Sequence, residues 1–142
     1  MKHTFIKTLV AASVLASGAA FAQQTVKIAY IDGLSGMMGP VGQNQVKSFG
    51  EVINRANDAK APWAAGYKFQ LDTYDNKTSP QETLTILKTV IDQGYRYVAQ
   101  GNSSGVGMAL QDAINKHNDR NPGKEIVYLN YAAIDPDMTN SK

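Results

Sequence analysis

The chain has 142 residues, no cysteine and two histidines, and its 14 basic residues against 12 acidic residues give a formal net charge of +2. Two basic residues, Lys2 and Lys7, precede residue 22, whereas every acidic residue follows it, so residues 23–142 carry equal numbers of each charge. This balance, without a run of like charges, argues against nucleic acid as a partner. A single histidine after residue 22 excludes a His/Cys metal site, and no motif requires a cofactor.

Residues 1–22 have the pattern of a cleavable secretory signal. A positive start is followed by an apolar, alanine-rich run over 9–20 and by an A-x-A cleavage site that ends at Ala22. The run is shorter than the about 20 apolar residues that a membrane span needs. We therefore expect export to the periplasm, cleavage after Ala22 and one domain over 23–142. An N-terminal amphipathic helix of the mature domain is the alternative.

Strands and helices are predicted to alternate along the rest of the chain. Runs rich in β-branched and aromatic residues predict strands over 26–31, 67–72, 95–100 and 126–130. Apolar residues at helical spacing predict helices between these strands, with apolar faces at 46, 49, 52, 53 and 56, at 84, 87, 90 and 91, and at 106, 109, 110, 113 and 114.

The second of these helices has the clearest ends. Ser79 is a good N-cap, Pro80 suits the first helical position, and Glu82 completes an S-x-x-E capping box. Gly94 is a typical residue for ending the helix. These signals predict a helix that begins at Pro80 and ends shortly before Gly94.

The alternating order predicts an α/β fold, a parallel sheet with helices on both faces. Such sheets bind ligands beyond the carboxyl ends of their strands. The segments expected at those ends are 32–36, 72–79, 101–105 and 131–134. A ligand site is therefore predicted at that edge of the sheet.

The pentapeptide GNSSG, residues 101–105, fits the G-x-S-x-G nucleophile elbow of α/β-hydrolases. A nucleophilic Ser103 needs a histidine base within hydrogen-bond reach. His117 falls on the helix that GNSSG starts, about 20 Å further along its axis. A serine–lysine pair has no obvious candidate either, because Lys77 is the only lysine near a predicted strand end. We expect His117 to pack or cap near its helix end, and a serine hydrolase remains an alternative.

Other chemical motifs are weaker. No dinucleotide-binding or P-loop glycine motif occurs. Glycines recur every third residue from Gly33 to Gly42 without a nearby cation, which favours a flexible loop of close approach over a phosphate loop. Asp72 and Asp75 could form a carboxylate pair, but turn and cap chemistry is the favoured interpretation.

Ser103 and Ser104 can instead form a binding cradle. They precede a helix, so their hydroxyls and the free amides of the first turn are available to one small anion, such as a carboxylate. A plain serine N-cap without a ligand is the alternative.

Four segments together resemble a known family. They are VKIAYIDGLSGMMGPVG (26–42), YDNKTSP (74–80), YVAQGNSSG (97–105) and NYAAIDPDMT (130–139). Behind a secretory signal, they are similar to the N-terminal lobe of branched-chain amino-acid periplasmic binding proteins. That family has the type I periplasmic binding fold and delivers ligands to ABC transporters.

The resemblance implies a set of ligand-binding residues. By analogy, Ser103 and Ser104 hold the ligand α-carboxylate. The backbone of Ala132, Ala133 and Ile134 meets the carboxylate and ammonium. The loop that starts at Ser35 and Gly36 overhangs the pocket. The family often has Thr or Ser where this chain has Ile134, which removes one polar contact. The chain also ends after the fourth strand, so the family's second lobe is missing and a truncated lobe is expected.

The implied function is capture of an amino acid, branched-chain or otherwise apolar, or of a related small carboxylate. The implied partner is a membrane ABC permease. No catalysis and no metal are expected. A secreted serine hydrolase using Ser103, a solute-sensing lobe of a receptor system and a non-functional truncated product are the alternatives.

Overall fold

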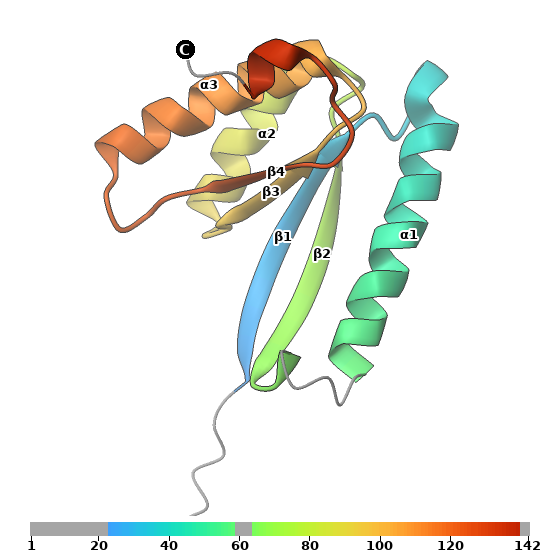
Figure 1. The fold of residues 1–142 in the computed structure, drawn as a ribbon, viewed down its shortest axis with the longest axis vertical. Helices are drawn as coiled ribbons and strands as arrows, with labels where there is room; N and C mark the ends of the chain where they lie inside the picture. Colours follow the sequence, from blue (N-terminus) through green and yellow to red (C-terminus); the bar gives the residue numbers. More distant parts are fainter. Residues whose placement is uncertain (1–22, 59–63, 140–142) are drawn as a thin grey trace, which may run out of the picture.

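The computed structural model describes residues 23–58 and 64–139, which form one α/β unit (Figure 1). Within these residues, four strands alternate with three α-helices, and two short 3-10 helices lie in loops. The strands are β1 (Gln24–Asp32), β2 (Tyr67–Asp75), β3 (Tyr97–Gln100) and β4 (Val127–Asn130). The helices are η1 (Gly36–Met38), α1 (Gly39–Asp58), α2 (Pro80–Asp92), α3 (Ser104–Arg120) and η3 (Pro136–Met138). The predicted signal at 1–22 lies outside the described residues.

The four strands form one parallel sheet in the order β2-β1-β3-β4, which confirms the predicted α/β class. Ile28 of β1 is in register with Leu71 of β2 on one side and with Tyr97 of β3 on the other. Because all strands run the same way, their carboxyl ends meet at one edge of the sheet. That edge carries the loops that the sequence predicts as a ligand site.

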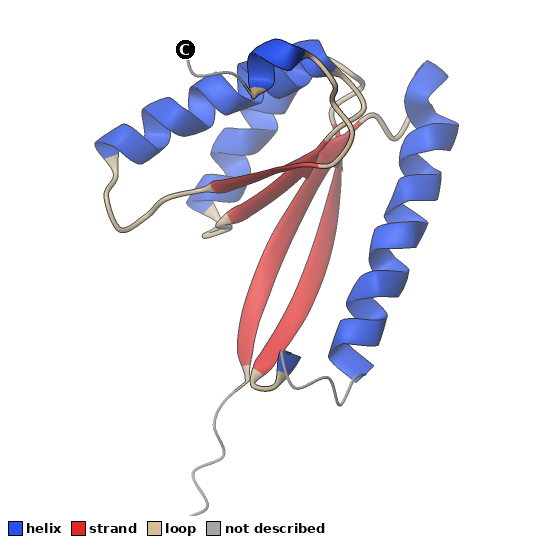
Figure 2. Ribbon diagram, viewed as in Figure 1, coloured by secondary structure: helices blue, strands red, loops and turns tan. Residues whose placement is uncertain are grey.

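Helices α2 and α3 cover one face of the sheet, and α1 lies on the other side (Figures 1 and 2). The main core is between the sheet and the helix pair α2 and α3. Its buried apolar residues are Ala29, Ile31, Leu87, Val90, Tyr95, Val98, Leu110, Ile114 and Ile126. Burying them stabilises the fold by about 25 cal/mol for each Å² of apolar surface removed from water.

Helix α2 begins and ends as the sequence predicts. The Ser79 hydroxyl oxygen accepts a hydrogen bond from the Glu82 N–H at 3.3 Å, and Pro80 occupies the first turn. Gly94 has a φ of +82°, a left-handed conformation that glycine adopts without steric cost. Local capping chemistry therefore sets both ends of this helix.

The glycine run between Gly33 and Gly42 is not the flexible loop that the sequence suggests. Helix η1 begins at Gly36, and α1 is already helical from Gly39. The expected close approach is present, because a Cβ on Gly42 would lie 2.0 Å from the Gly33 carbonyl oxygen. Small residues are needed here to let α1 rest against the end of β1.

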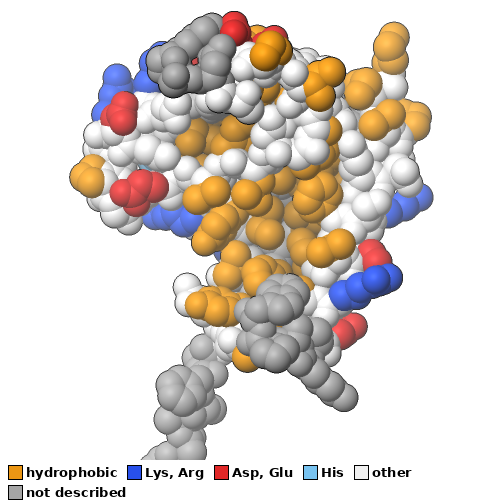
Figure 3. All heavy atoms as spheres, in the orientation of Figure 1, with side chains coloured by type: hydrophobic (Ala, Val, Ile, Leu, Met, Phe, Trp, Pro, Cys, Tyr) orange, Lys and Arg blue, Asp and Glu red, His pale blue; other side chains and the backbone are white. Residues whose placement is uncertain are grey.

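The α1 face of the sheet is only partly covered by the described residues. Tyr97, Val127 and Leu129 of β3 and β4 remain 37%, 46% and 39% exposed. Figure 3 shows hydrophobic side chains gathered over the middle of this face. This hydrophobic surface extends to α1 through a wholly apolar depression of about 230 Å³. The depression is lined by Ile28, Phe49, Val52, Ile53, Ala56, Phe69 and Leu129. The predicted helices on both faces are thus present, but on the α1 side the described helix covers only β1 and β2. Among the described residues, no helix is long and apolar enough to cross a membrane.

Candidate functional site

GNSSG connects β3 to α3 at the carboxyl-end edge of the sheet, and its last two residues, Ser104 and Gly105, are the first two of α3. The half-buried Ser103 is the N-cap of α3, and its hydroxyl oxygen accepts a hydrogen bond from the Val106 N–H at 3.4 Å. The Ser103 carbonyl accepts from the buried Gln100 side chain at 3.1 Å. Both contacts fix the backbone of the turn, so the start of α3 presents its first-turn amides at this edge.

Ser104 connects this turn to the loop after β4. Its hydroxyl oxygen accepts a hydrogen bond from the Asp135 N–H at 3.3 Å. Gly101 permits a close approach between the same two segments, since a Cβ on Gly101 would lie 2.7 Å from the Ala132 nitrogen. The structure therefore brings Ser103 and Ser104 next to the segment 131–135, as the predicted site requires.

The loop after β4 is held by the side chain of Asn130. Its Oδ1 accepts hydrogen bonds from the N–H groups of Ala132 and Ala133 at 3.2 and 2.8 Å, and its Nδ2 donates to the Ala133 carbonyl at 3.0 Å. The two amides predicted to meet a ligand are thus engaged within the loop. Ile134 is 89% exposed, so its apolar side chain is free to meet a ligand or another surface.

Ser35 lies at the same edge and is tied to Asp75 at the end of β2, and Gly36 follows it in the chain. Gly36 has a φ of +62° and starts η1. Asp75 Oδ1 accepts from the Leu34 N–H at 2.9 Å. Burial raises the pKa of the Asp75 carboxyl, but hydrogen bonds from the Ser35 side chain and from two backbone N–H groups outweigh it, and the pKa is lowered. The contacts agree with the turn chemistry predicted for Asp75, and Met37 beside them is 95% exposed.

Asp72 is not paired with Asp75. Its Oδ2 instead accepts hydrogen bonds from the Tyr95 hydroxyl at 2.6 Å and from the Gln70 side chain at 2.8 Å. Burial first, and then the bond to Asp72, raise the pKa of Tyr95. The two carboxylates therefore serve separate structural contacts.

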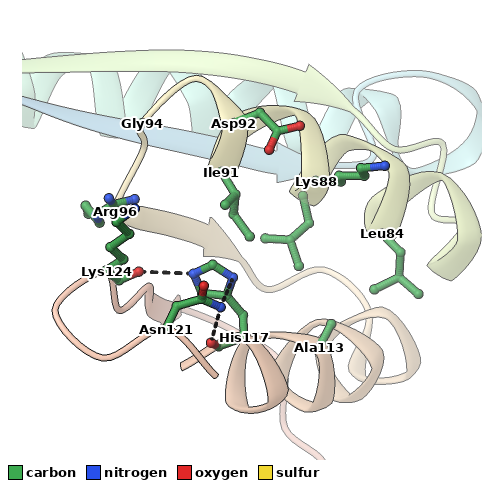
Figure 4. Close-up of a pocket in the computed structure, with 11 residues that line it drawn as sticks. Leu84, Lys88, Ile91, Asp92, Gly94, Arg96, Ala113, His117, Asn121 and Lys124 are labelled. Carbon is green, nitrogen blue, oxygen red and sulfur yellow. Dashed lines mark hydrogen bonds between the residues drawn. The ribbon is translucent and has the colours of Figure 1, made fainter. Parts of the chain in front are cut away.

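His117 lies in a different part of the molecule from Ser103. It lines a groove of about 730 Å³ between α2 and α3 with residues such as Leu84, Ile91 and Lys88 (Figure 4). Its Nε2 is 3.0 Å from the Lys124 carbonyl oxygen, which fits the predicted role near the helix end. Ser103 precedes α3 and His117 belongs to its last turn, about 20 Å along the axis. Among the residues that the structure describes, the elbow pattern therefore has no histidine base within reach.

Asp32 is an important residue at this edge that is predicted from the sequence only as the first residue of the segment 32–36. It is fully buried at the end of β1. Its Oδ2 accepts hydrogen bonds from the Gly101 and Asn102 N–H groups at 2.9 and 3.0 Å and from the Tyr131 hydroxyl at 2.6 Å. A carboxylate at the end of an otherwise apolar buried strand is the sequence signal that could have identified it.

Two tyrosines extend the contacts of Asp32 toward α1. The Tyr131 and Tyr30 hydroxyl oxygens are 2.6 Å apart, and each is 3.1 Å from Gln45 Oε1. Burial raises the pKa of both tyrosines, and the bond to Asp32 raises that of Tyr131 further. Both hydroxyls therefore stay protonated at neutral pH, which keeps Tyr131 a donor to the carboxylate.

Comparison with known proteins places the chain in a family. Residues 25–141 match the family model described as periplasmic binding protein. The chain is 33% identical over 132 residues to the Leu/Ile/Val-binding protein homolog 4 of Brucella abortus (strain 2308), a match that covers 93% of this chain and 31% of that protein. The homolog 4 of Brucella suis biovar 1 (strain 1330) gives the same values.

Solved structures similar to this chain are amino-acid-binding proteins as well. The closed form of a leucine-, isoleucine-, valine-, threonine- and alanine-binding protein from Brucella ovis has 33% identity and a TM-score of 0.65, over 78% of this chain and 28% of that one. The branched-chain amino acid transporter substrate binding protein of Streptococcus pneumoniae, in complex with isoleucine, has 19% identity and a TM-score of 0.67, over 82% and 31%, and shows the shared fold. The chain thus spans less than a third of these relatives. The family match, which covers most of the chain, shows that it belongs to the periplasmic binding proteins, a family of solute-binding proteins.

Proposed function

We propose that the chain is the N-terminal lobe region of a solute-binding component of an ABC transporter. In this proposal the ligand is an amino acid with an apolar side chain, or a related small carboxylate. The Brucella ovis relative, named for binding leucine and other amino acids, supports this ligand class at 33% identity. The observation that carries the proposal is the contact between Ser104 and Asp135, which joins a helix N-terminus to the loop after β4 at one edge.

The proposed ligand groups are the hydroxyls of Ser103 and Ser104, the backbone of 132–134, and the loop at Ser35 and Gly36. To meet a ligand, the Ala132 and Ala133 N–H groups exchange their hydrogen bonds to Asn130 for bonds to the ligand. A carboxylate suits the first of these, because N–H groups at a helix start and serine hydroxyls both donate to anions. The exposed apolar side chain of Ile134 suits an apolar ligand rather than a very polar one.

Binding is tested by calorimetric titration of L-leucine and L-isoleucine into the full chain, with L-glutamate as a polar comparison. We expect heat of binding for the apolar amino acids and none for glutamate. Preference for glutamate, or no binding of any amino acid, would contradict the proposed ligand class.

We also propose that the chain performs no catalysis. Within residues 23–58 and 64–139, no histidine lies within reach of Ser103, which supports this proposal, as does the solute-binding family. A fluorophosphonate probe, which labels activated serines, is expected to leave Ser103 unlabelled under conditions that label a known serine hydrolase completely. Labelling at Ser103 would favour the hydrolase alternative.

Export to the periplasm is proposed from residues 1–22. The expected result is a periplasmic protein whose first residue is Gln23, because cleavage after Ala22 follows the A-x-A rule. Intact-mass measurement of the periplasmic fraction checks this. A mass that still includes residues 1–22 would show that the segment is retained, and replacing Ala20 and Ala22 by larger residues should block cleavage in the same assay.

A further inference from the structure

One buried carboxylate accepts hydrogen bonds at the meeting point of the two candidate ligand segments. Asp32 Oδ1 accepts from the Gly33 N–H at 2.8 Å. Asp32 Oδ2 accepts from the N–H groups of Gly101 and Asn102 and from the Tyr131 hydroxyl. All four donors are uncharged, so hydrogen bonds rather than a cation stabilise the Asp32 carboxylate in these contacts. Hydrogen bonds to an ionised acceptor are about twice as strong as those to a neutral one.

The donors are direct chain neighbours of the proposed ligand groups. Gly101 and Asn102 immediately precede Ser103, and Tyr131 immediately precedes Ala132. A shift of any donor by a fraction of an ångström moves the next residue with it, because the intervening backbone is short and planar at each peptide. The distance between the two segments therefore depends on Asp32.

The ring of Tyr131 is held independently of its hydroxyl. It stacks on Tyr30 with ring centroids 5.7 Å apart and meets Phe49 edge-on at 5.1 Å. It also lies against Gly101, where a Cβ would come within 2.8 Å of two ring atoms. Replacing Tyr131 by phenylalanine should thus remove the hydrogen bonds and leave the packing.

We propose that Asp32 and Tyr131 form a positioning pair that holds the 101–105 turn and the 131–135 loop at the separation needed to bind one ligand carboxylate. The inference rests on the proposed function. Neither residue touches the ligand; both act through Ser103, Ser104 and the 132–134 backbone. Because Asp32 already takes the amides of Gly101 and Asn102, a ligand anion is left with the serine hydroxyls and the first-turn amides of α3.

The chain contains a matched control. Tyr95 is buried and, like Tyr131, donates from its hydroxyl to a carboxylate, in this case Asp72, at the same distance of 2.6 Å. Tyr95 precedes β3, whereas Gly101 follows it, so Tyr95 lies at the opposite end of that strand from the proposed site. Tyr95→Phe makes the same chemical change as Tyr131→Phe without touching the proposed site.

The experiment compares both variants in the full chain by amide hydrogen exchange without ligand and by calorimetry with L-leucine. Tyr131→Phe is expected to speed exchange of the Gly101 and Asn102 amides about tenfold and to weaken L-leucine binding about tenfold, the size of one hydrogen bond to a charged group. Tyr95→Phe is expected to lower the melting temperature as much as Tyr131→Phe does, but to change neither the amide exchange at Gly101 and Asn102 nor the affinity for L-leucine.

Two results would overturn the positioning pair. One is exchange at Gly101 and Asn102 that is the same in Tyr131→Phe as in the wild type. The other is unchanged affinity in Tyr131→Phe when the wild type does bind L-leucine. Combining Asp32→Asn with Tyr131→Phe should weaken binding by less than the product of the single effects, because both remove one interaction. Full multiplication of the effects would show two independent contributions.

The same experiment separates this inference from the proposed function. If the wild type does not bind L-leucine, the proposed ligand class fails. The exchange comparison between Tyr131→Phe and Tyr95→Phe still decides whether the hydroxyl positions the turn. If Asp32→Asn does not fold, the two tyrosine variants carry the test alone.

Discussion

Replacing Ser103 and Ser104 together by alanine is expected to weaken amino-acid binding by about 100-fold or more. Each hydroxyl is proposed to donate to the ligand carboxylate, and a hydrogen bond to a charged group contributes about 1.5–3 kcal/mol. Two such losses exceed 2.7 kcal/mol, and every 1.4 kcal/mol is tenfold in the dissociation constant. Calorimetric titration of L-leucine into the full chain measures the change.

Ser103 also caps α3, so loss of binding must be separated from loss of helix stability. Removing a serine N-cap costs about 1 kcal/mol, and the hydroxyl oxygen of Ser103 accepts from Val106 in this role. Ser103→Asp keeps the cap, because aspartate is as good an N-cap as serine, but it directs a negative charge at the ligand carboxylate. We expect this variant to keep its melting temperature and to lose binding.

Ser48→Ala is the matched control for these substitutions. The Ser48 hydroxyl donates to the Asn44 carbonyl on the exposed side of α1, at 3.2 Å. Its loss should leave ligand affinity unchanged. If the Ser103 and Ser104 double variant binds as tightly as Ser48→Ala, the two hydroxyls do not hold the ligand, and the cap alone accounts for Ser103.

Gly42→Ala is expected to destabilise the fold by about 3 kcal/mol or more, the upper range for overpacking. The added methyl group would lie 2.0 Å from the Gly33 carbonyl oxygen and 3.0 Å from its carbon. Both are backbone atoms at the end of β1, so no side-chain rotation relieves the overlap. Helix α1 must move away, which also disturbs the hydrogen bond from the Gln43 side chain to the Leu34 carbonyl.

Gly50→Ala provides the comparison on the same helix. Apart from its chain neighbours and the adjacent backbone of its own helix, no atom lies within 4 Å of a Cβ added at Gly50. Alanine is favoured over glycine inside a helix by about 0.5–1 kcal/mol, so this variant should be slightly more stable than the wild type. Urea unfolding midpoints of the two variants give the difference directly. Equal midpoints would show that α1 does not rest on Gly33 as the structure has it.

Several elements could be predicted from local sequence because local chemistry determines them. The cap at Ser79 and the first-turn Pro80 need only their neighbours along the chain, and α2 begins where they indicate. The first, third and fourth strands were also placed to within two residues by their β-branched and aromatic runs. The strand ends then located the candidate site, since parallel strands present all carboxyl ends at one edge.

Other features depended on pairing that local patterns do not contain. β2 continues to Asp75, three residues beyond its predicted end, because Thr73, Tyr74 and Asp75 pair with the end of β1. The glycine run was expected to be a flexible loop of close approach, because glycine is conformationally permissive and no cation lies nearby to meet a phosphate. In the structure, the first turns of α1 pack against the Gly33 backbone, and this close contact requires small residues such as Gly42 inside the helix.

By itself, the sequence determined the alternation of strands and helices, the caps, and the edge at which Ser35, Ser103 and Ala132 lie. These follow from periodicity and from neighbours a few residues apart. Only the tertiary structure decided the role of Asp32, whose partners Gly101 and Tyr131 are 69 and 99 residues away in the chain. A carboxylate acquires such partners when the sheet places β1 beside β3 and the loop after β4 closes over their ends, and nothing in the local pattern around Asp32 specifies that contact.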